Sequence, residues 1–331
     1  MRTITNLGEV PWLRDEDDPI ATAEWYFPSA CGNVELHTVI WKGQGQPKAI
    51  LQIAHGMEEH IERYDAFARY VAQHGVLVVG NDHLGHGKSV PSEEYLGYFG
   101  LEEGQDLLVQ DMFALTREVR ALYPQLPYFL LGHSMGSMLA QLYAVRFPNA
   151  LTALLLIGPS AHNPLARFMR RSVEKHIHRY GLFSRRCFFE KLLSRLYNAR
   201  VHPHRTPFDW VSSDPVEVDR YIRDPLCGFP FTAAGLRDLL TANILIHEKR
   251  WFRSVPKFLP IHFFAGGQDP VGGYGKGVQK NVKKLQHRGI PVTLKVYPNA
   301  RHELFHDFCK DEAFADVTGA IFAHIPEGPQ R

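Results

Sequence analysis

The sequence has few cysteines and no long apolar run. Its cysteines are Cys31, Cys187, Cys227 and Cys309. Because they lie far apart and form no Cys-x-x-Cys pair, they argue against a structural zinc site and against a dense disulfide framework. No run reaches 18 apolar residues, and the acidic N-terminal segment lacks the apolar stretch of a signal peptide. These absences predict a cytoplasmic chain without a transmembrane helix, which can meet a membrane only peripherally.

The chain also has little net charge. Its 37 Lys and Arg and 35 Asp and Glu leave a formal charge of +2, which gives no indication of a nucleic-acid partner. The charge is uneven, however, because residues 160–205 contain eleven basic residues and two acidic ones. The basic residues include Arg167, Arg170, Arg171, Lys175, Arg179, Arg185 and Arg186, and the acidic ones are Glu174 and Glu190. We call residues 160–205 the basic segment.

Short apolar runs alternate with longer amphipathic ones from about residue 33, as is typical of strands and helices that take turns around a parallel sheet. The predicted strands are 34–41, 49–54, 76–81, 128–131, 151–157, 261–265 and 292–297, and the predicted helices are 61–73, 103–122, 137–147, 276–288 and 303–322. The alternation breaks between the strands 151–157 and 261–265, which predicts an insertion. We therefore expect an α/β fold with a mostly parallel central sheet. Its core comprises residues 1–159 and 251–331, and a helical cap comprises residues 160–250.

The segment Gly132-His133-Ser134-Met135-Gly136 lies between a predicted strand and a predicted helix. Small residues flank the serine in a nucleophile elbow because the tight strand-to-helix turn leaves no room for larger ones. The G-x-S-x-G pattern alone is weak, and an ordinary glycine-rich turn is the alternative. The strand before it and the helix after it favour the elbow, so Ser134 is the candidate nucleophile.

A serine nucleophile needs a base, and the base needs an acid that orients it. Asp269 and His302 each follow a predicted strand, and the carboxyl ends of parallel strands meet at one edge of a sheet. The order Ser, Asp, His is also that of hydrolases with this elbow. Position favours His302 over His287, which lies within a predicted helix, and over His306 and His324, which lie within or after the last one. Rivals of Asp269 lie in the predicted cap at Asp214, Asp219 and Asp224.

Two backbone N–H groups must stabilise the oxyanion that forms when the serine attacks. In a nucleophile elbow the residue after the serine, here Met135, supplies one of them. The second usually comes from the loop after an earlier strand, and His55-Gly56-Met57 follows the predicted strand 49–54. We expect the N–H of Met57 to be the second donor, and a plain turn is the alternative for this loop.

Five segments together resemble the monoacylglycerol lipase and lysophospholipase branch, of the serine aminopeptidase S33 type, of the α/β-hydrolases. They are His55-Gly56-Met57-Glu58-Glu59-His60, Asp82-His83-Leu84-Gly85-His86-Gly87-Lys88-Ser89, Gly132-His133-Ser134-Met135-Gly136, Asp269-Pro270-Val271-Gly272 and Arg301-His302-Glu303. The resemblance spans roughly residues 30–160 and 255–325. It implies an α/β-hydrolase fold whose cap, inserted after the sixth core strand, covers the active site. It gives the triad roles to Ser134, Asp269 and His302, and the oxyanion-hole positions to Met57 and Met135.

This resemblance predicts a serine hydrolase that cleaves the carboxylic ester of a monoacylglycerol or a lysophospholipid through an acyl-enzyme. Such chemistry needs no metal and no organic cofactor. A small-ester hydrolase or a peptidase is the alternative on the same fold, because the triad does not fix the leaving group. Acyl transfer to an alcohol stays open, and so does a non-catalytic binding protein, although the full set of triad residues argues against the latter.

Apolar residues recur at helical spacing within the basic segment. They are Leu165, Phe168, Met169, Val173 and Ile177. A helix with this stripe beside a basic face suits contact with an anionic lipid surface, or guidance of a charged headgroup. Packing of the stripe on the hydrolase core, with the arginines toward water, explains the pattern equally well. Nucleic acid is a weaker explanation because no recognised binding motif accompanies the charge.

Overall fold

The computed structural model describes residues 18–185 and 195–326, and it contains one eight-stranded sheet in the order β1-β2-β4-β3-β5-β6-β7-β8. The strands are β1 Ala21–Pro28, β2 Glu35–Lys42, β3 Ala49–Ala54, β4 Val76–Asn81, β5 Tyr128–His133, β6 Ala153–Ile157, β7 Ile261–Gly266 and β8 Val292–Tyr297. Only the pairs β1–β2 and β2–β4 are antiparallel, and the other pairs are parallel. The predicted α/β fold with a mostly parallel sheet is confirmed.

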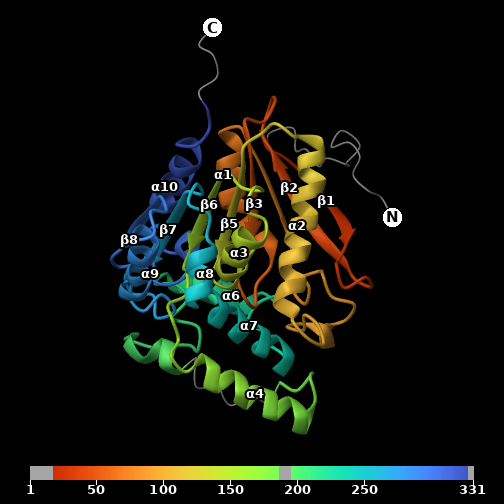
Figure 1. Cartoon of the computed structure of the whole chain (residues 1–331), viewed down its shortest axis with the longest axis vertical. Helices are drawn as coiled ribbons and strands as arrows, with labels where there is room; N and C mark the ends of the chain where they lie inside the picture. Colours follow the sequence, from red (N-terminus) through yellow and green to blue (C-terminus); the bar gives the residue numbers. More distant parts are fainter. Residues whose placement is uncertain (1–17, 186–194, 327–331) are drawn as a thin grey trace.

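Helices cover both faces of this sheet (Figure 1). One face packs against α1 (Asp65–Gln73) and α10 (Lys310–Phe322), through Phe67 and Val317 among others. The other face packs against α2 (Gly104–Leu122), α3 (Met135–Arg146), α8 (Lys249–Ser254) and α9 (Lys276–Gln286). The central strands β3, β5 and β6 are buried along their whole length. Burial on both faces explains why they read as continuous apolar runs in the sequence.

The described residues between β6 and β7 correspond to the predicted cap, and we refer to them by that name. It contains α4 (Ala166–Tyr180), α6 (Pro215–Arg223) and α7 (Ala233–Ile246), all within the predicted insertion, while α8 spans its predicted end at residue 250. Figure 1 shows α4 outermost, with α7 between it and the sheet. Met169 and Val173 pack α4 on α7. Leu165 and Phe168, by contrast, remain 61% and 65% exposed. One part of the predicted apolar stripe therefore packs on α7, and the other part is exposed to solvent.

Some predictions concern residues outside the described ranges. Residues 1–17, Arg186, Cys187 and Glu190 are among them. Within the ranges that are described, no helix is both long enough and apolar enough to cross a membrane. The cytoplasmic location stays a prediction.

Two elements differ from the sequence prediction. Strand β1 was not predicted, because its side chains are only partly buried at an antiparallel edge of the sheet, which weakens the apolar signal. The last helix was predicted from residue 303, but α10 begins at Lys310. The residues before α10 form hydrogen bonds with the cap. The N–H of Glu303 donates to the Val211 carbonyl, and the carboxylate of Asp307 accepts from the N–H of Ser213. These contacts with the cap exclude α-helical geometry over the first turns, where Leu304–His306 form a 3₁₀ helix instead.

Candidate active site

Ser134 lies at the turn between β5 and α3. Its φ of +50° and ψ of −114° form a combination that non-glycine residues rarely adopt outside functional sites. A Cβ on Gly132 would lie 2.3 Å from the Gly136 carbonyl oxygen, and one on Gly136 would lie 2.0 Å from that of Ala54. Close packing of the turn thus requires a glycine on each side. The serine is held at the N-terminus of α3, in the position that a nucleophile elbow provides.

Ser134, His302 and Asp269 form a hydrogen-bonded row. The Oγ atom of Ser134 is 2.7 Å from Nε2 of His302, and Nδ1 of that imidazole is 3.0 Å from Oδ2 of Asp269. Asp269 is fully buried, and its other oxygen accepts a hydrogen bond from the N–H of Val271. Burial opposes a charge on the imidazole, but the attraction of the Asp269 carboxylate and its hydrogen bond outweigh burial and raise the pKa of His302. The geometry suits a base that takes the serine proton.

The rival carboxylates of the cap have other partners. Asp214 caps α6 by accepting from the N–H of Val216. Asp219 pairs with Arg205 at the surface, and Asp224 pairs with His60. The structure therefore brings Asp269, and none of these three, to the imidazole of the row.

The predicted oxyanion donors belong to Met57 and Met135. Met135 is the first residue of α3, and Met57 lines the same cavity as Ser134. A Cβ on Gly56 would lie 3.2 Å from the Cβ of Ser134, so the loop before Met57 packs against the nucleophile. In the described part of the chain, neither methionine N–H donates to another backbone carbonyl. Both donors are thus free to bind a negative oxygen, and the dipole of α3 favours such a charge.

The serine opens into a cavity of about 740 Å³, a volume typical of sites for drug-sized molecules. Much of the wall comes from the cap and is apolar: Tyr197, Val201, Phe208, Trp210, Val211, Leu236 and Leu239. The polar part of the lining includes Glu58, Arg195, His202 and His204. The ring of Trp210 lies 5.1 Å from that of His302. This arrangement suits a ligand with a long apolar part and a small polar end.

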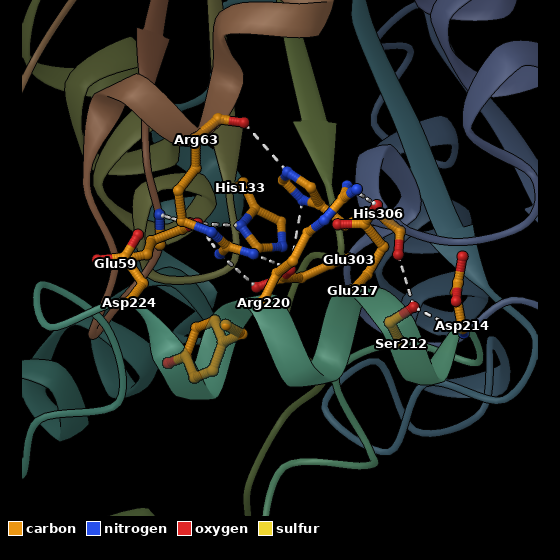
Figure 2. A network of polar contacts seen from close by, with 12 residues as sticks. Glu59, Arg63, His133, Ser212, Asp214, Glu217, Arg220, Asp224, Glu303 and His306 are labelled. Atoms are coloured by element: carbon orange, nitrogen blue, oxygen red, sulfur yellow. Dashed lines mark hydrogen bonds and ion pairs between the residues drawn. The ribbon is translucent and has the colours of Figure 1, made fainter.

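A buried ion network, which Figure 2 shows, includes the sequence neighbours of Ser134 and His302. Arg63 donates two hydrogen bonds to the carboxylate of Glu303, at 2.8 and 2.6 Å, and a third to Glu59 at 2.6 Å. Glu59 also pairs with Nδ1 of His133 at 2.9 Å. Burial alone would raise both carboxyl pKa values. The charge of His133 nevertheless holds the pKa of Glu59 below its usual value, and Arg63 holds that of Glu303 well below.

This network joins the segments that carry the candidate site residues. Glu303 follows His302, His133 precedes Ser134, and Glu59 belongs to the loop of Met57. The network is not evident from the sequence, although its members lie inside or next to the motifs. The signal that was available is the presence of charged residues within or next to those motifs. Their pairing was not readable, because Arg63 and Glu303 are 240 residues apart.

One further group of residues could hold a metal ion. In the described ranges, a set of three His, Cys, Asp or Glu ligands close enough together is found at His60, Asp224 and Cys227. It contains no member of the Ser134 row.

Comparison with known sequences finds similarity over most of the chain. A family model described as "Serine aminopeptidase, S33" matches residues 45–308. Human monoglyceride lipase is 30% identical over 299 residues, which cover 86% of this chain and 83% of that protein. Monoacylglycerol lipase of Mycolicibacterium smegmatis is 28% identical over 301 residues, which cover 89% and 95% respectively.

Solved structures resemble the whole fold. A thermostable carboxyl esterase from Bacillus coagulans, in complex with glycerol, matches with a TM-score of 0.86 and 32% identity over 92% of this chain and 99% of that one. A soluble variant of monoglyceride lipase from Saccharomyces cerevisiae matches with a TM-score of 0.68 and 16% identity, over 99% and 98%. The second match bears on the fold alone.

Proposed function

The chain belongs to the serine aminopeptidase S33 family of α/β-hydrolases, in its monoacylglycerol lipase-like branch, and we propose that it hydrolyses the ester of a long-chain monoacylglycerol. One observation carries the proposal: the Oγ of Ser134 lies 2.7 Å from Nε2 of His302 at the wall of a largely apolar cavity. The relatives named monoglyceride lipases, and the similar esterase that binds glycerol, support a glycerol leaving group.

In the proposed reaction, Nε2 of His302 accepts the Ser134 proton while Oγ attacks the ester carbonyl carbon. The N–H groups of Met57 and Met135 stabilise the oxyanion, and Asp269 holds the imidazole in orientation and stabilises its charge. His302 then donates the proton to the leaving glycerol oxygen as the C–O bond breaks. The acyl group remains on Ser134.

Water completes the proposed cycle. His302 accepts a proton from a water molecule while the water oxygen attacks the acyl carbon of the acyl-enzyme. The bond to Ser134 breaks, the proton returns to Oγ, and a fatty acid leaves. Each proton in both half-reactions passes through the same imidazole nitrogen, which the ion pair with Asp269 keeps directed at the serine.

A lysophospholipid is the second candidate substrate. Arg195, His202 and His204 line the polar part of the cavity, and cationic or hydrogen-bonding groups there can attract a phosphate. The glycerol ester and the phosphate-bearing ester share the acyl chain and differ only in the headgroup. A substrate pair of matched chain length therefore isolates the headgroup preference.

The test measures initial rates of fatty-acid release from a monoacylglycerol and a lysophospholipid of the same acyl chain. Ser134→Ala protein is the blank for both. We expect the unmodified protein to release fatty acid from the monoacylglycerol, and the Ser134→Ala protein to release none. Rapid release from the lysophospholipid alone would reassign the headgroup. A protein that cleaves neither lipid, but cleaves a short-chain ester or an aminoacyl peptide through Ser134, would overturn the lipid assignment.

A further inference from the structure

His60, Asp224 and Cys227 meet at the junction of the core and the cap. His60 ends the loop that carries Met57, and the other two lie in the turn that follows α6. One ligand atom from each residue lies within 4.8 Å of the other two. We propose that these three side chains bind a zinc ion.

The donor set matches the preferences of zinc. An imidazole nitrogen, a carboxylate oxygen and a thiolate sulfur are its usual protein ligands, whereas Mg²⁺ and Ca²⁺ prefer oxygen alone. Nε2 of His60 and Oδ2 of Asp224 are 2.9 Å apart. Two such ligands on a tetrahedral zinc are about 3.3 Å apart, from bond lengths of about 2.0 Å. Replacement of their shared proton by the ion thus needs only a small adjustment.

The sulfur has farther to move, but it can reach the ion. A thiolate ligand lies about 2.3 Å from zinc, hence about 3.6 Å from the other donors. Starting from the 4.8 Å limit, Sγ of Cys227 must approach the other donors by about 1.2 Å at most. Cys227 is a free, buried cysteine, so no disulfide competes for the sulfur.

The surroundings of His60 also suit a ligand. Its side chain is 9% exposed, and in the described part of the chain its Nδ1 has no hydrogen-bond partner. The carboxylate of Glu62 lies 3.8 Å from this nitrogen. A metal-bound imidazole commonly donates its second N–H to a carboxylate, which fixes the tautomer that leaves Nε2 free for the ion. Glu62 is placed for that role.

The local charges are compatible with a zinc ion bound to these three residues. A divalent ion with one carboxylate and one thiolate is electrically neutral, and the nearby charge of Arg63 is already matched by Glu59 and Glu303. Zinc binding must release the thiol proton of Cys227, so affinity should increase with pH. Cysteine spacing could not indicate this site, because His60 precedes Asp224 by 164 residues.

Bound zinc would fix the cap to the loop that carries an oxyanion donor. The two are already linked, because the carbonyl of Glu58 accepts from the N–H of Gly228 and from the hydroxyl of Tyr221, both at 3.0 Å. Glu58 and Gly228 also line the cavity. An ion one residue from Gly228 would therefore stiffen one wall of the substrate cavity.

The experiment titrates Co²⁺, as a spectroscopic substitute for zinc, into the full chain after removal of bound metals by a chelator. We expect a thiolate-to-cobalt charge-transfer band in the near ultraviolet that saturates at one equivalent and disappears on addition of Zn²⁺. Zn²⁺ should also raise the Tm by a few degrees, on the order expected for a ligand well above its Kd. Ser134→Ala protein should behave identically, so the result does not depend on the proposed hydrolysis.

Matched variants decide the assignment. Cys227→Ser should lose the band, whereas Cys309→Ser, at another free cysteine, should keep it. Asp224→Asn retains the thiol and should weaken Co²⁺ binding by about tenfold or more. His324→Ala, which breaks a His262–His324 pair with nitrogens 2.9 Å apart, controls for adventitious histidine binding and should keep the band. A band that is absent from the unmodified chain, or that survives in Cys227→Ser, would overturn the proposal.

Discussion

The carboxylate of Glu303 and the guanidinium of Arg63 form a two-point ion pair one residue away from His302. A two-point contact between planar groups fixes orientation as well as distance. The same guanidinium holds Glu59, which in turn holds His133, next to the candidate nucleophile. Arg63 therefore links the loop of His302 to the end of β5 before Ser134 through buried charges.

Replacement of Arg63 by Met should destabilise the protein. It leaves two buried carboxylates without their cation, and breaking a buried pair in this way costs about 3–5 kcal/mol. The measurement is the free energy of unfolding in urea. Arg69→Met is the matched control, because Arg69 also pairs with two carboxylates but is 31% exposed, and its loss should cost about 1 kcal/mol or less. Equal losses for the two variants would contradict this account of the network.

The rate of ester hydrolysis should depend on the protonation state of His302. The imidazole must be neutral to accept the serine proton, so kcat/KM should increase with pH through its pKa, which Asp269 raises above the ordinary value. Asp269→Asn removes that attraction and should move the ascending limb to lower pH. It should also lower kcat by about 10⁴. The measurement is the pH profile of kcat/KM in both proteins.

Asp219→Asn is the control for that experiment. Asp219 pairs with Arg205 at the surface of the cap, so the substitution removes a carboxylate without touching the row. Its profile should coincide with that of the unmodified protein. An ascending limb that stays in place in Asp269→Asn would show that the titrating group is not the imidazole beside Asp269.

Gly136 should not tolerate a methyl group. In Gly136→Ala the new Cβ would lie 2.0 Å from the Ala54 carbonyl oxygen, and the required displacement of the backbone should cost about 3 kcal/mol. Gly319 lies in α10 with nothing within 4 Å of an added Cβ. Gly319→Ala should therefore stabilise the protein by about 0.5–1 kcal/mol. Unfolding in urea measures both changes, and opposite signs are the expected result.

The sequence predicted the core well because its signals are local. Central strands covered on both faces read as apolar runs, and the steric demands of the turn at Ser134 appear as two glycines at fixed spacing. Asp269 and His302 were found by position after strands, since parallel strands end at one edge. These inferences needed no knowledge of contacts between distant residues.

What the sequence did not predict depends on distant contacts. From the sequence alone, Arg63 looks like an ordinary surface cation of a helical turn. Only the structure shows that it pairs with Glu303. The first turns of the predicted last helix look regular, yet the Val211 carbonyl binds the N–H groups of His302 and Glu303. The role of α4 was undecided for the same reason: periodicity groups Phe168 with Met169, and only the position of α7 separates them.

Met169 packs against α7, whereas Phe168 is exposed and available for another contact. We propose that α4 binds the surface of anionic membranes. Phe168 and Leu165 are exposed next to the exposed Arg167 and Arg171, a combination that favours insertion between anionic lipid headgroups. Phe168→Ser should reduce cosedimentation with phosphatidylserine vesicles, and Arg171→Glu should reduce it by about fivefold or more, since each basic residue contributes about 1 kcal/mol.

Phe308→Ser is the control for the membrane experiment, because Phe308 is 74% exposed but lies just before α10, on the core. Vesicle binding that declines equally in Phe308→Ser and Phe168→Ser would reflect general hydrophobicity and remove α4 from the proposal. Hydrolysis of a short, freely dissolved ester should be unchanged in all three variants, since none of these side chains lines the cavity. If vesicle binding and release of fatty acid from vesicles fall together while that rate stays constant, α4 contributes to substrate access and has no part in the chemistry.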